Sequence, residues 1–528
     1  MVVHSTRGFQ LANQELKAPL PINESQPEPL RNRTARAGMV SGGAEVVTRV
    51  LTIALSIATA RALEPAEVGA LVLAVIVIGI VSMVASYAET AAIVSRSEAR
   101  DGQYALAASV IRGVITAALL AIIVAALPLA TRLLAGKEGD VPQLAALVSA
   151  LMWQPVLELG ACYPRVVLQR QLDLTYLALV NLIQVVSHVV LSVALLWNGY
   201  GALGVVWSSL IAAALTALML WTRLLRSQIP RGGSFGLSTR AWRQTTWETA
   251  NIFSGGFIGY INMRLDNLLV AGALGPTGMS FYSMAWNASR APVLVFSTAF
   301  SSVLMPTMAR IQDDSERVKR AVCESLQHSY ILLAPVSLAM FIYAGTIVPV
   351  VLGAKWAPMV PCLRVMSITI LAAPLIYAWQ ALFIVSRRAY LTSVPAAVHI
   401  LVLTVLMVPI TKLTGLLGAA FVDLTGVMAV TVTGILLNSR FRRMLTRGVL
   451  SAVLVPIGAA GIAGLGGYAI SLSLPIGMWH DTLWLSTALM LYPLLLVGFG
   501  GRQGLLNTLE LLRGIRNERN KLRAVVQN

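Results

Sequence analysis

Cysteine is nearly absent from this chain, and the common nucleotide-phosphate motif is missing. The 3 cysteines among 528 residues, Cys162, Cys323 and Cys362, are widely separated. They give neither a disulfide framework nor a metal-ligand spacing. No Gly-x-x-x-x-Gly-Lys-Ser/Thr segment is present to cradle a phosphate. We therefore expect no metal site, no cofactor and no ATPase within this polypeptide.

Charged residues are also scarce. They make up 12% of the chain against 57% hydrophobic residues, which excludes an ordinary soluble domain. Apolar stretches long enough to cross a bilayer occur about fourteen times, and they lack the short alternating pattern of barrel strands. They start near residues 39, 66, 104, 142, 174, 202, 248, 279, 326, 360, 391, 416, 447 and 480. We expect an all-α integral membrane protein with about fourteen transmembrane helices.

The excess of basic residues indicates orientation in a membrane and not nucleic-acid binding. The formal net charge is +17, but about thirty of the 40 Lys and Arg fall in the two tails and in alternate loops. By the positive-inside rule both termini are cytoplasmic, together with the loops from Arg223 to Arg243 and from Arg440 to Arg447. We expect a multi-pass protein that contacts membrane lipids and binds no nucleic acid.

The two ends of the chain differ from its apolar middle. Residues 1–38 are polar, contain four prolines and lack an apolar core, which indicates a disordered cytoplasmic tail and not a signal peptide. Residues 501–528 place leucines at helical spacing among basic side chains. That pattern favours a basic amphipathic helix on the cytoplasmic leaflet, with an ordinary solvated tail as the alternative.

Three short patterns recur at nearly one spacing and indicate an internal repeat. The pairs are Ala60 to Pro65 with Ala271 to Pro276, Ser41-Gly42-Gly43 with Ser254-Gly255-Gly256, and Gly201-Ala-Leu-Gly204 with Gly415-Leu-Leu-Gly418. A shift of about six helices preserves orientation across the membrane, so the copies are parallel repeats, and transporters built this way bind their ligand between the repeats. Chance agreement in a chain rich in Ala, Leu and Gly is the alternative.

The repeat divides the chain into two six-helix lobes around a central cavity, followed by two further helices. We expect an N-lobe at residues 39–224, a cytoplasmic linker at 225–247 and a C-lobe at 248–440. The two additional helices then occupy residues 441–500.

One stretch of the C-lobe resembles a known family. It comprises Arg264, Asp266-Asn-Leu-Leu-Val270, Gly272-Ala-Leu-Gly275 and Tyr282 to Ala285, followed by Pro306 and a basic loop. These residues resemble the seventh and eighth helices of bacterial polysaccharide flippases of the multidrug/oligosaccharidyl-lipid/polysaccharide (MOP) exporter superfamily. With the Gly69-containing turn and the six-plus-six layout, the resemblance covers roughly residues 39 to 440.

The resemblance implies a flippase that moves polyprenyl-diphosphate-linked oligosaccharide units across the bacterial cytoplasmic (inner) membrane by alternating access. The product would be a surface polysaccharide such as lipopolysaccharide or exopolysaccharide. A polysaccharide polymerase or co-polymerase is the partner implied.

Other functions remain open at this point. A lipid II flippase of the same superfamily needs the same diphosphate site. A MATE-like drug/cation antiporter predicts a cavity dominated by acids. A membrane enzyme of polysaccharide assembly would be expected to carry a large outer loop with paired acids, whereas the longest predicted outer connection runs only from Thr131 to Val141. We expect a transporter and not an enzyme.

Four arginines lie inside predicted spans: Arg49, Arg112, Arg264 and Arg290. A guanidinium at bilayer depth costs about 2.5 to 3.5 kcal/mol on insertion scales, so such groups usually face a bundle interior or a wet cavity. We expect Arg49 and Arg264, in the first helix of each lobe, on opposing walls of one cavity, with Arg290 at a similar depth. A diphosphate there would accept forked hydrogen bonds. Arg112 lies nearer the inner surface and could snorkel to it.

Acidic residues near these arginines allow a second interpretation. Glu45 precedes Arg49 by four residues, the spacing of an ion pair that merely neutralises the arginine. Asp266, one turn after Asn262, is a candidate to line the cavity, to bind a coupling cation (H⁺ or Na⁺) or to change protonation. A structural hydrogen bond is its alternative role. Asp423 is a weaker candidate of the same kind.

Two further helix faces carry polar side chains. One face has Asn181, Gln184 and His188 at spacings of three and four, and the other has Asn287 one turn before Arg290. We take His188 and Asn287 as candidate substrate ligands. Hydrogen bonding between helices is the commoner use of such residues.

Overall fold

The computed structural model describes residues 30–94, 102–135, 141–170, 173–226, 239–311, 314–386, 388–444, 447–471, 478–498 and 506. Within these ranges every regular element is a helix, which confirms the all-α prediction for the described part of the chain. Nearly all of the predicted amphipathic segment at 501–528, and residues 1–29 of the predicted tail, lie outside the described residues.

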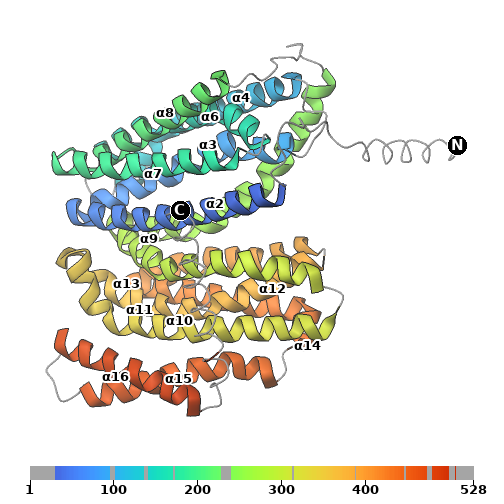
Figure 1. Cartoon of the computed structure of the whole chain (residues 1–528). Helices are drawn as coiled ribbons and strands as arrows, with labels where there is room; N and C mark the ends of the chain where they lie inside the picture. Colours follow the sequence, from blue (N-terminus) through green and yellow to red (C-terminus); the bar gives the residue numbers. More distant parts are fainter. Residues whose placement is uncertain are drawn as a thin grey trace, which may run out of the picture.

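The N-lobe forms the upper part of the molecule in Figure 1. Its helices are α2 (Leu30–Ala62), α3 (Pro65–Val94), α4 (Gly102–Ala135), α5 (Val141–Leu151), α6 (Trp153–Arg170), α7 (Leu174–Trp197) and α8 (Gly201–Arg226). Helix α7 packs against both α2 and α8, while α3 packs against α6. One predicted span, starting near residue 142, is thus divided between α5 and α6.

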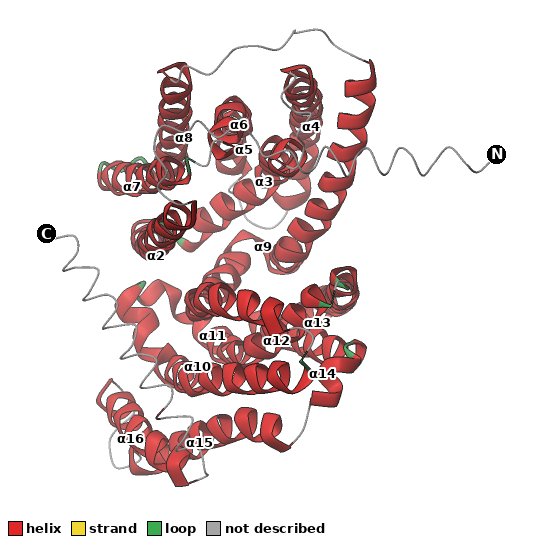
Figure 2. Cartoon of the chain, turned by 45° about the vertical axis from the view of Figure 1, so that its right-hand side comes forward, coloured by secondary structure: helices red, strands yellow, loops and turns green. Residues whose placement is uncertain are grey.

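The C-lobe lies below it in the same view, with α9 passing between the two (Figure 1). Its helices are α9 (Thr239–Ile311), α10 (Ser315–Val351), η2 (Ala354–Met359), α11 (Val360–Thr369), η3 (Ile370–Ala372), α12 (Ala373–Val385), η4 (Ala389–Thr392), α13 (Ser393–Leu437) and α14 (Ser439–Met444). Helices α15 (Arg447–Ser471) and α16 (Met478–Leu496) pack on each other and on α10, on the side away from the N-lobe (Figure 2).

Two long helices are kinked at a glycine. Gly275 in α9 has φ 78° and Gly415 in α13 has φ 69°, a region that glycine enters without steric penalty. In the sequence repeat, the segment that contains Gly275 matches the turn between α2 and α3. Gly415 matches Gly201, which has φ 58° at the start of α8. The chain therefore breaks at matching places in both lobes, which supports the internal repeat.

Nine candidate membrane spans and two shorter apolar helices are found in the described residues. Each of the predicted start positions falls on a helix. The count of about fourteen spans stays a prediction from the apolar pattern.

Two helices extend beyond predicted boundaries. Helix α2 already begins at Leu30, inside the predicted disordered tail, and α9 begins at Thr239, inside the predicted linker at 225–247. Both extensions have one cause. A polar composition marks where a segment leaves the hydrocarbon core of the membrane. A helix can continue beyond that point into water, because its backbone N–H and C=O groups are hydrogen-bonded within the helix, and Leu, Arg and Ala favour this.

Close backbone packing joins α9 to the N-lobe. Helix α3 runs against α9, and the Tyr260 hydroxyl donates to the Ile76 carbonyl at 2.9 Å. Gly69 lies against the backbone of Pro276, so that a Cβ at Gly69 would collide with the Pro276 carbonyl. Since Pro276 starts the second half of α9, the α2–α3 turn of one repeat meets the kink of the other.

A Gly69→Ala substitution should therefore destabilise the protein by about 1 to 3 kcal/mol, because backbone atoms must move to admit the methyl group. The measurement is the melting temperature of the purified protein in detergent. Gly272→Ala is the matched control, since a Cβ there meets nothing within 4 Å. Equal melting temperatures for the two variants would contradict the proposed close contact.

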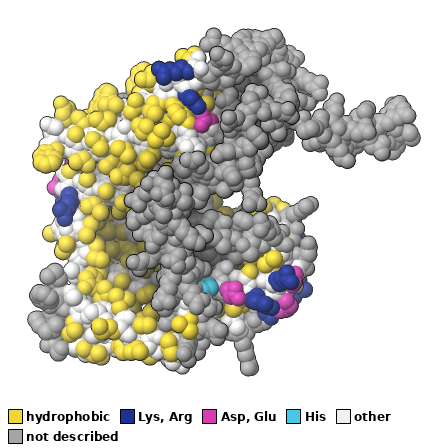
Figure 3. Space-filling view, viewed as in Figure 1, with side chains coloured by type: hydrophobic (Ala, Val, Ile, Leu, Met, Phe, Trp, Pro, Cys, Tyr) yellow, Lys and Arg dark blue, Asp and Glu magenta, His cyan; other side chains and the backbone are white. Residues whose placement is uncertain are grey.

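Hydrophobic side chains cover much of the described surface in Figure 3, and charged ones gather in small groups. This distribution is expected for a protein whose flanks contact lipid.

Candidate functional site

Arg290 lies in the second half of α9 and is the centre of a buried polar cluster. Its guanidinium carbon is 5.1 Å from the centroid of the Trp286 ring, one helical turn earlier, within cation–π range. Its Nε is buried without a hydrogen-bond acceptor in the part of the chain that the structure describes. Electrostatic interactions link Arg290 to Asp266, Asp423 and His399.

Asp266 is 4% exposed and well supplied with donors. Its Oδ1 accepts from the Asn267 backbone N–H at 2.8 Å and from Asn267 Nδ2 at 3.0 Å. Its Oδ2 accepts from the Tyr282 hydroxyl at 3.2 Å. The kink at Gly275 folds the two halves of α9 together, which is how Tyr282 reaches Asp266. The structural hydrogen bond named as the alternative role for Asp266 is therefore present.

Asp423 on α13 has a poorer environment. It is 2% exposed, and its Oδ2 has no hydrogen-bond partner among the described residues. It also interacts electrostatically with Asp266. Two buried carboxylates that share the influence of one arginine favour binding of a further cation or a proton, because unpaired buried charge is costly. Asp266 and Asp423, which were identified separately in the sequence, thus belong to one cluster.

His399 on α13 completes the cluster, and sequence reasoning missed it. Its Nδ1 lies 3.1 Å from Asn262 Oδ1, and its Nε2 is buried without a partner in the described ranges. Asn262 is one turn before Asp266, as predicted. A lone histidine in an apolar segment carries no pattern, so only the packing of α13 against α9 reveals its place.

The other two mid-span arginines have different surroundings. Arg49 pairs with Glu45 at 2.8 Å, and the two side chains are 44% and 45% exposed. The intrahelical ion pair considered as the alternative role is thus present, on a part of α2 that other helices do not cover. Arg264 is partly buried and is hydrogen-bonded to the Tyr260 hydroxyl on the same helix. No contact between Arg49 and Arg264 is found in the described structure.

The two candidate polar ligands fit less well. His188 Nδ1 lies 3.1 Å from Ser208 Oγ, which contacts Ser192 Oγ at 2.5 Å, so the histidine joins α7 to α8. The contact between helices named as the commoner use of such residues is thus present for His188, and its role as a substrate ligand stays a prediction. Asn287 is exposed on α9.

A second polar network lies inside the N-lobe. Arg112 is 1% exposed with Nη1 at 3.2 Å from Cys162 Sγ, so the suggestion that it snorkels to the surface is wrong. Glu158 lies within α6, and its Oε1 accepts from Gln154 Nε2 at 3.0 Å. Arg165 on the same helix donates to Asn181 at 3.2 Å.

Solved structures share this arrangement of helices. The lipid II flippase MurJ in an inward closed conformation matches with a TM-score of 0.68 at 14% identity, over 87% of this chain and 98% of that one. An inward-facing MATE family transporter of the MOP superfamily matches with a TM-score of 0.59 at 17% identity, over 75% and 94%. The chain is therefore an all-helical membrane protein whose fold is like those of MurJ and the MATE transporter.

Sequence comparison is more specific. The family model described as polysaccharide biosynthesis protein matches residues 58–361, so the chain belongs to that family. This confirms the resemblance noted in the sequence.

Two curated bacterial relatives are similar to part of the chain. The lipopolysaccharide biosynthesis protein WzxC of Escherichia coli K12 is 26% identical over 241 residues, 45% of this chain and 48% of WzxC. The succinoglycan biosynthesis transport protein ExoT of Rhizobium meliloti is 26% identical over 335 residues, 62% of this chain and 65% of ExoT. The matches thus span about half to two thirds of the length of these relatives.

Proposed function

We propose that this protein flips polyprenyl-diphosphate-linked oligosaccharide units across the bacterial cytoplasmic membrane by alternating access, for the synthesis of a surface polysaccharide. The observation that carries the proposal is the Arg290 guanidinium, held against Trp286 with its Nε–H unpaired among the described residues. A diphosphate oxygen is a suitable acceptor, because guanidinium donors match phosphate geometry. Family membership and the similarity to WzxC and ExoT support the same substrate class.

The headgroup is the part of the substrate that needs a polar route. Lipid-linked sugars carry a diphosphate that hydrocarbon excludes, whereas the polyprenyl chain is at home in the bilayer. Arg290 and Arg264 on α9 would bind the diphosphate from the C-lobe side. Arg49 on α2 would contribute after exchanging Glu45 for the substrate, since a half-exposed ion pair contributes little stability.

The two buried carboxylates give this site a means of ion coupling. Asp266 and Asp423 both attract Arg290 when they are ionised. Binding of H⁺ or Na⁺ between them would weaken that attraction and leave Arg290 available to the diphosphate. Cation and anion would then bind cooperatively, and by linkage each would raise the affinity of the other.

The same diphosphate chemistry would serve lipid II, and the test therefore includes both substrates. Proteoliposomes containing the purified chain receive either a polyprenyl-diphosphate oligosaccharide or lipid II, and headgroup accessibility at the outer surface is followed in time. We expect translocation of the oligosaccharide. Faster translocation of lipid II would assign the chain to peptidoglycan precursors instead.

Within that assay Arg264→Ala should lower the initial rate at least about tenfold, since one lost charge-assisted hydrogen bond is worth about 1.5 to 3 kcal/mol. Arg388→Ala, at an exposed position before η4, is the matched control for loss of a positive charge. Wild-type rates in both Arg264→Ala and Arg49→Ala would exclude a shared diphosphate site.

A further inference from the structure

We propose that Arg61 and Lys355 form a releasable latch that holds the outer ends of the two lobes together. The latch comprises Arg61 and the end of α2 on the N-lobe, and Val350, Val351, Lys355 and Trp356 on the C-lobe. The inference rests on the proposed alternating access, in which the outer ends must part once in each cycle.

The first half of the latch is made by Arg61, in the last turn of α2. Its Nε donates to the Val351 carbonyl at 2.7 Å, and its Nη2 donates to the Val350 carbonyl at 2.6 Å. These carbonyls belong to the last turn of α10, where helix carbonyls lack intrahelical partners. A cation at this end of a helix is also favoured by the helix dipole.

The second half runs in the opposite direction. Lys355 Nζ donates to the Leu63 carbonyl at 2.7 Å and to the Arg61 carbonyl at 3.1 Å, at the end of α2. It also lies 3.6 Å from Glu64 Oε1. Each lobe thus supplies the cation that caps the helix of the other lobe. Because the arrangement is reciprocal, separating the lobes breaks both caps at once.

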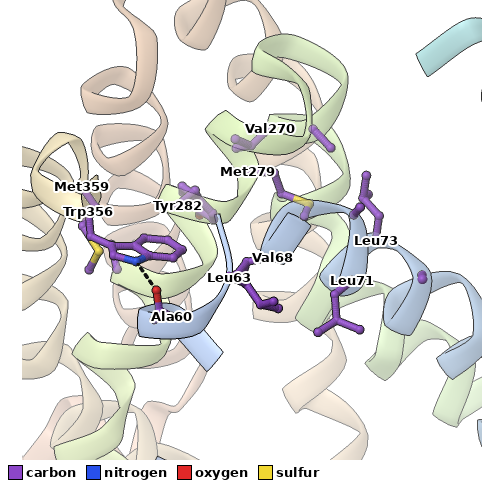
Figure 4. Close-up of a cluster of buried hydrophobic side chains, with 14 of the residues drawn as sticks. Ala60, Leu63, Val68, Leu71, Leu73, Val270, Met279, Tyr282, Trp356 and Met359 are labelled. Carbon is purple, nitrogen blue, oxygen red and sulfur yellow. Dashed lines mark hydrogen bonds between the residues drawn. The ribbon is translucent and has the colours of Figure 1, made fainter. Parts of the chain in front are cut away.

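A hydrophobic core lies directly beneath these caps. Trp356 is fully buried, and its Nε1 donates to the Ala60 carbonyl at 2.8 Å. Figure 4 shows this bond beside Leu63 of the N-lobe and Met359 and Tyr282 of the C-lobe. The Phe281 ring meets Trp356 edge-on at 5.7 Å. The apolar contacts exclude water, and the two cations at the rim further stabilise the state in which the outer ends of the lobes are closed.

The rim itself is accessible to water. Arg61 is exposed, and the Lys355 side chain is 27% exposed. When the latch opens, water replaces the protein carbonyls, so each cap contributes only a modest net free energy. A latch of this strength shifts the balance between closed and open states without fixing either.

Charge placement assigns the latch to the outer surface. Helix α10 begins with the basic cluster Arg317, Lys319 and Arg320 and ends at the latch. Because basic residues concentrate on the cytoplasmic side, the opposite end of α10 is outer. The latch also explains why Arg61 and Lys355 occupy outer positions against this rule.

The test measures the distance between the outer ends of the lobes directly. Spin labels are placed at Tyr200→Cys, between α7 and α8, and Leu413→Cys, before the α13 kink, both of which are exposed positions. The three native cysteines are replaced by serine or alanine, and folding is checked by size-exclusion chromatography. Pulsed electron paramagnetic resonance in proteoliposomes without substrate then gives the distance distribution.

We expect one short distance in the parent protein. The double variant Arg61→Gln/Lys355→Gln should gain a longer distance, with the open-to-closed ratio raised about tenfold. Lys412→Gln, an exposed outer cation on α13, is the control and should leave the distribution unchanged. The single variant Lys355→Gln should give an intermediate shift, and it serves as the test if the double variant fails to fold.

An unchanged distribution in both latch variants would overturn the proposal. The distances are read without any substrate, so failure of the transport assay with a wild-type chain would leave this result intact. Conversely, normal translocation together with an unchanged distance distribution would refute the latch alone.

Discussion

Replacing Arg290 by alanine is expected to reduce translocation of a diphosphate-linked substrate by at least about a hundredfold, the effect of losing two charge-assisted hydrogen bonds. The reason is positional. The Trp286 ring contacts the guanidinium from one side. The Nε–H has no acceptor among the described residues, so it can donate to the substrate without breaking an existing hydrogen bond. The measurement is the initial rate of headgroup translocation in proteoliposomes at matched protein density.

The same substitution also removes the cation that faces Asp266 and Asp423, so a loss of activity could reflect loss of folded protein. Breaking a buried charge arrangement by removing one partner costs about 3 to 5 kcal/mol. The double variant Arg290→Ala/Asp423→Asn separates the two effects, because it removes one uncompensated carboxylate together with the arginine. We expect it to recover protein level and melting temperature without recovering transport.

Two further variants complete this test. Arg290→Lys keeps the charge but presents a compact ammonium in place of a planar fork, so it should retain folding and only a small part of the activity. Asn287→Ala, one turn earlier and exposed, should lower the rate less than Arg290→Ala does, because a neutral amide forms a weaker hydrogen bond than a guanidinium. Full activity in Arg290→Ala/Asp423→Asn would exclude Arg290 as a substrate ligand.

Much of the fold could be predicted from the sequence because lipid imposes simple rules. In lipid, a segment must form all of its backbone hydrogen bonds internally, so long apolar runs predict helices. The alternation of basic loops predicts the direction in which each helix crosses the membrane. The kinks of α9 and α13 were not predicted, although the repeat contains the residues at which they occur. Gly275 and Gly415 fall within the two repeat patterns, and their positive φ explains why glycine stands there.

The site was only partly predictable. Arg290, Asp266 and Asp423 were identified one by one, as charges too costly to be incidental. Their meeting depends on the fold of α9 at Gly275 and on the packing of α13 against α9, neither of which leaves a local signal. His399 was missed for that reason.

The role of His188 shows the same difficulty. His188 has the spacing of a cavity-facing residue, yet it bonds to Ser208 across two helices. Residues that bind substrate and residues that join helices are both polar and both face inward, so helical periodicity does not separate them. The contacts of Arg61 and Lys355 could not be predicted, because their acceptors are backbone carbonyls, which no side-chain pattern records.

Neutralising the buried acids should remove the dependence of transport on a cation gradient. Asp423→Asn keeps the shape of the side chain but cannot bind H⁺ or Na⁺ as a carboxylate does, and Asp266→Asn should act in the same way. If cation binding releases Arg290, each variant should hold Arg290 permanently available to the diphosphate. Substrate would then bind without its usual cation requirement, while gradient-driven translocation should fall at least about tenfold, equivalent to a coupling of about 1.4 kcal/mol.

The measurement compares initial translocation rates with and without imposed Na⁺ and pH gradients, and it compares substrate binding at several Na⁺ concentrations. Asp173→Asn is the control, because that carboxylate forms a partly exposed ion pair with Arg223 at 2.9 Å, outside the cluster. A double variant Asp266→Asn/Asp423→Asn that still responds to the gradients as the parent does would exclude these acids as the coupling site. Loss of response to only one of the two gradients would identify the ion that these carboxylates bind.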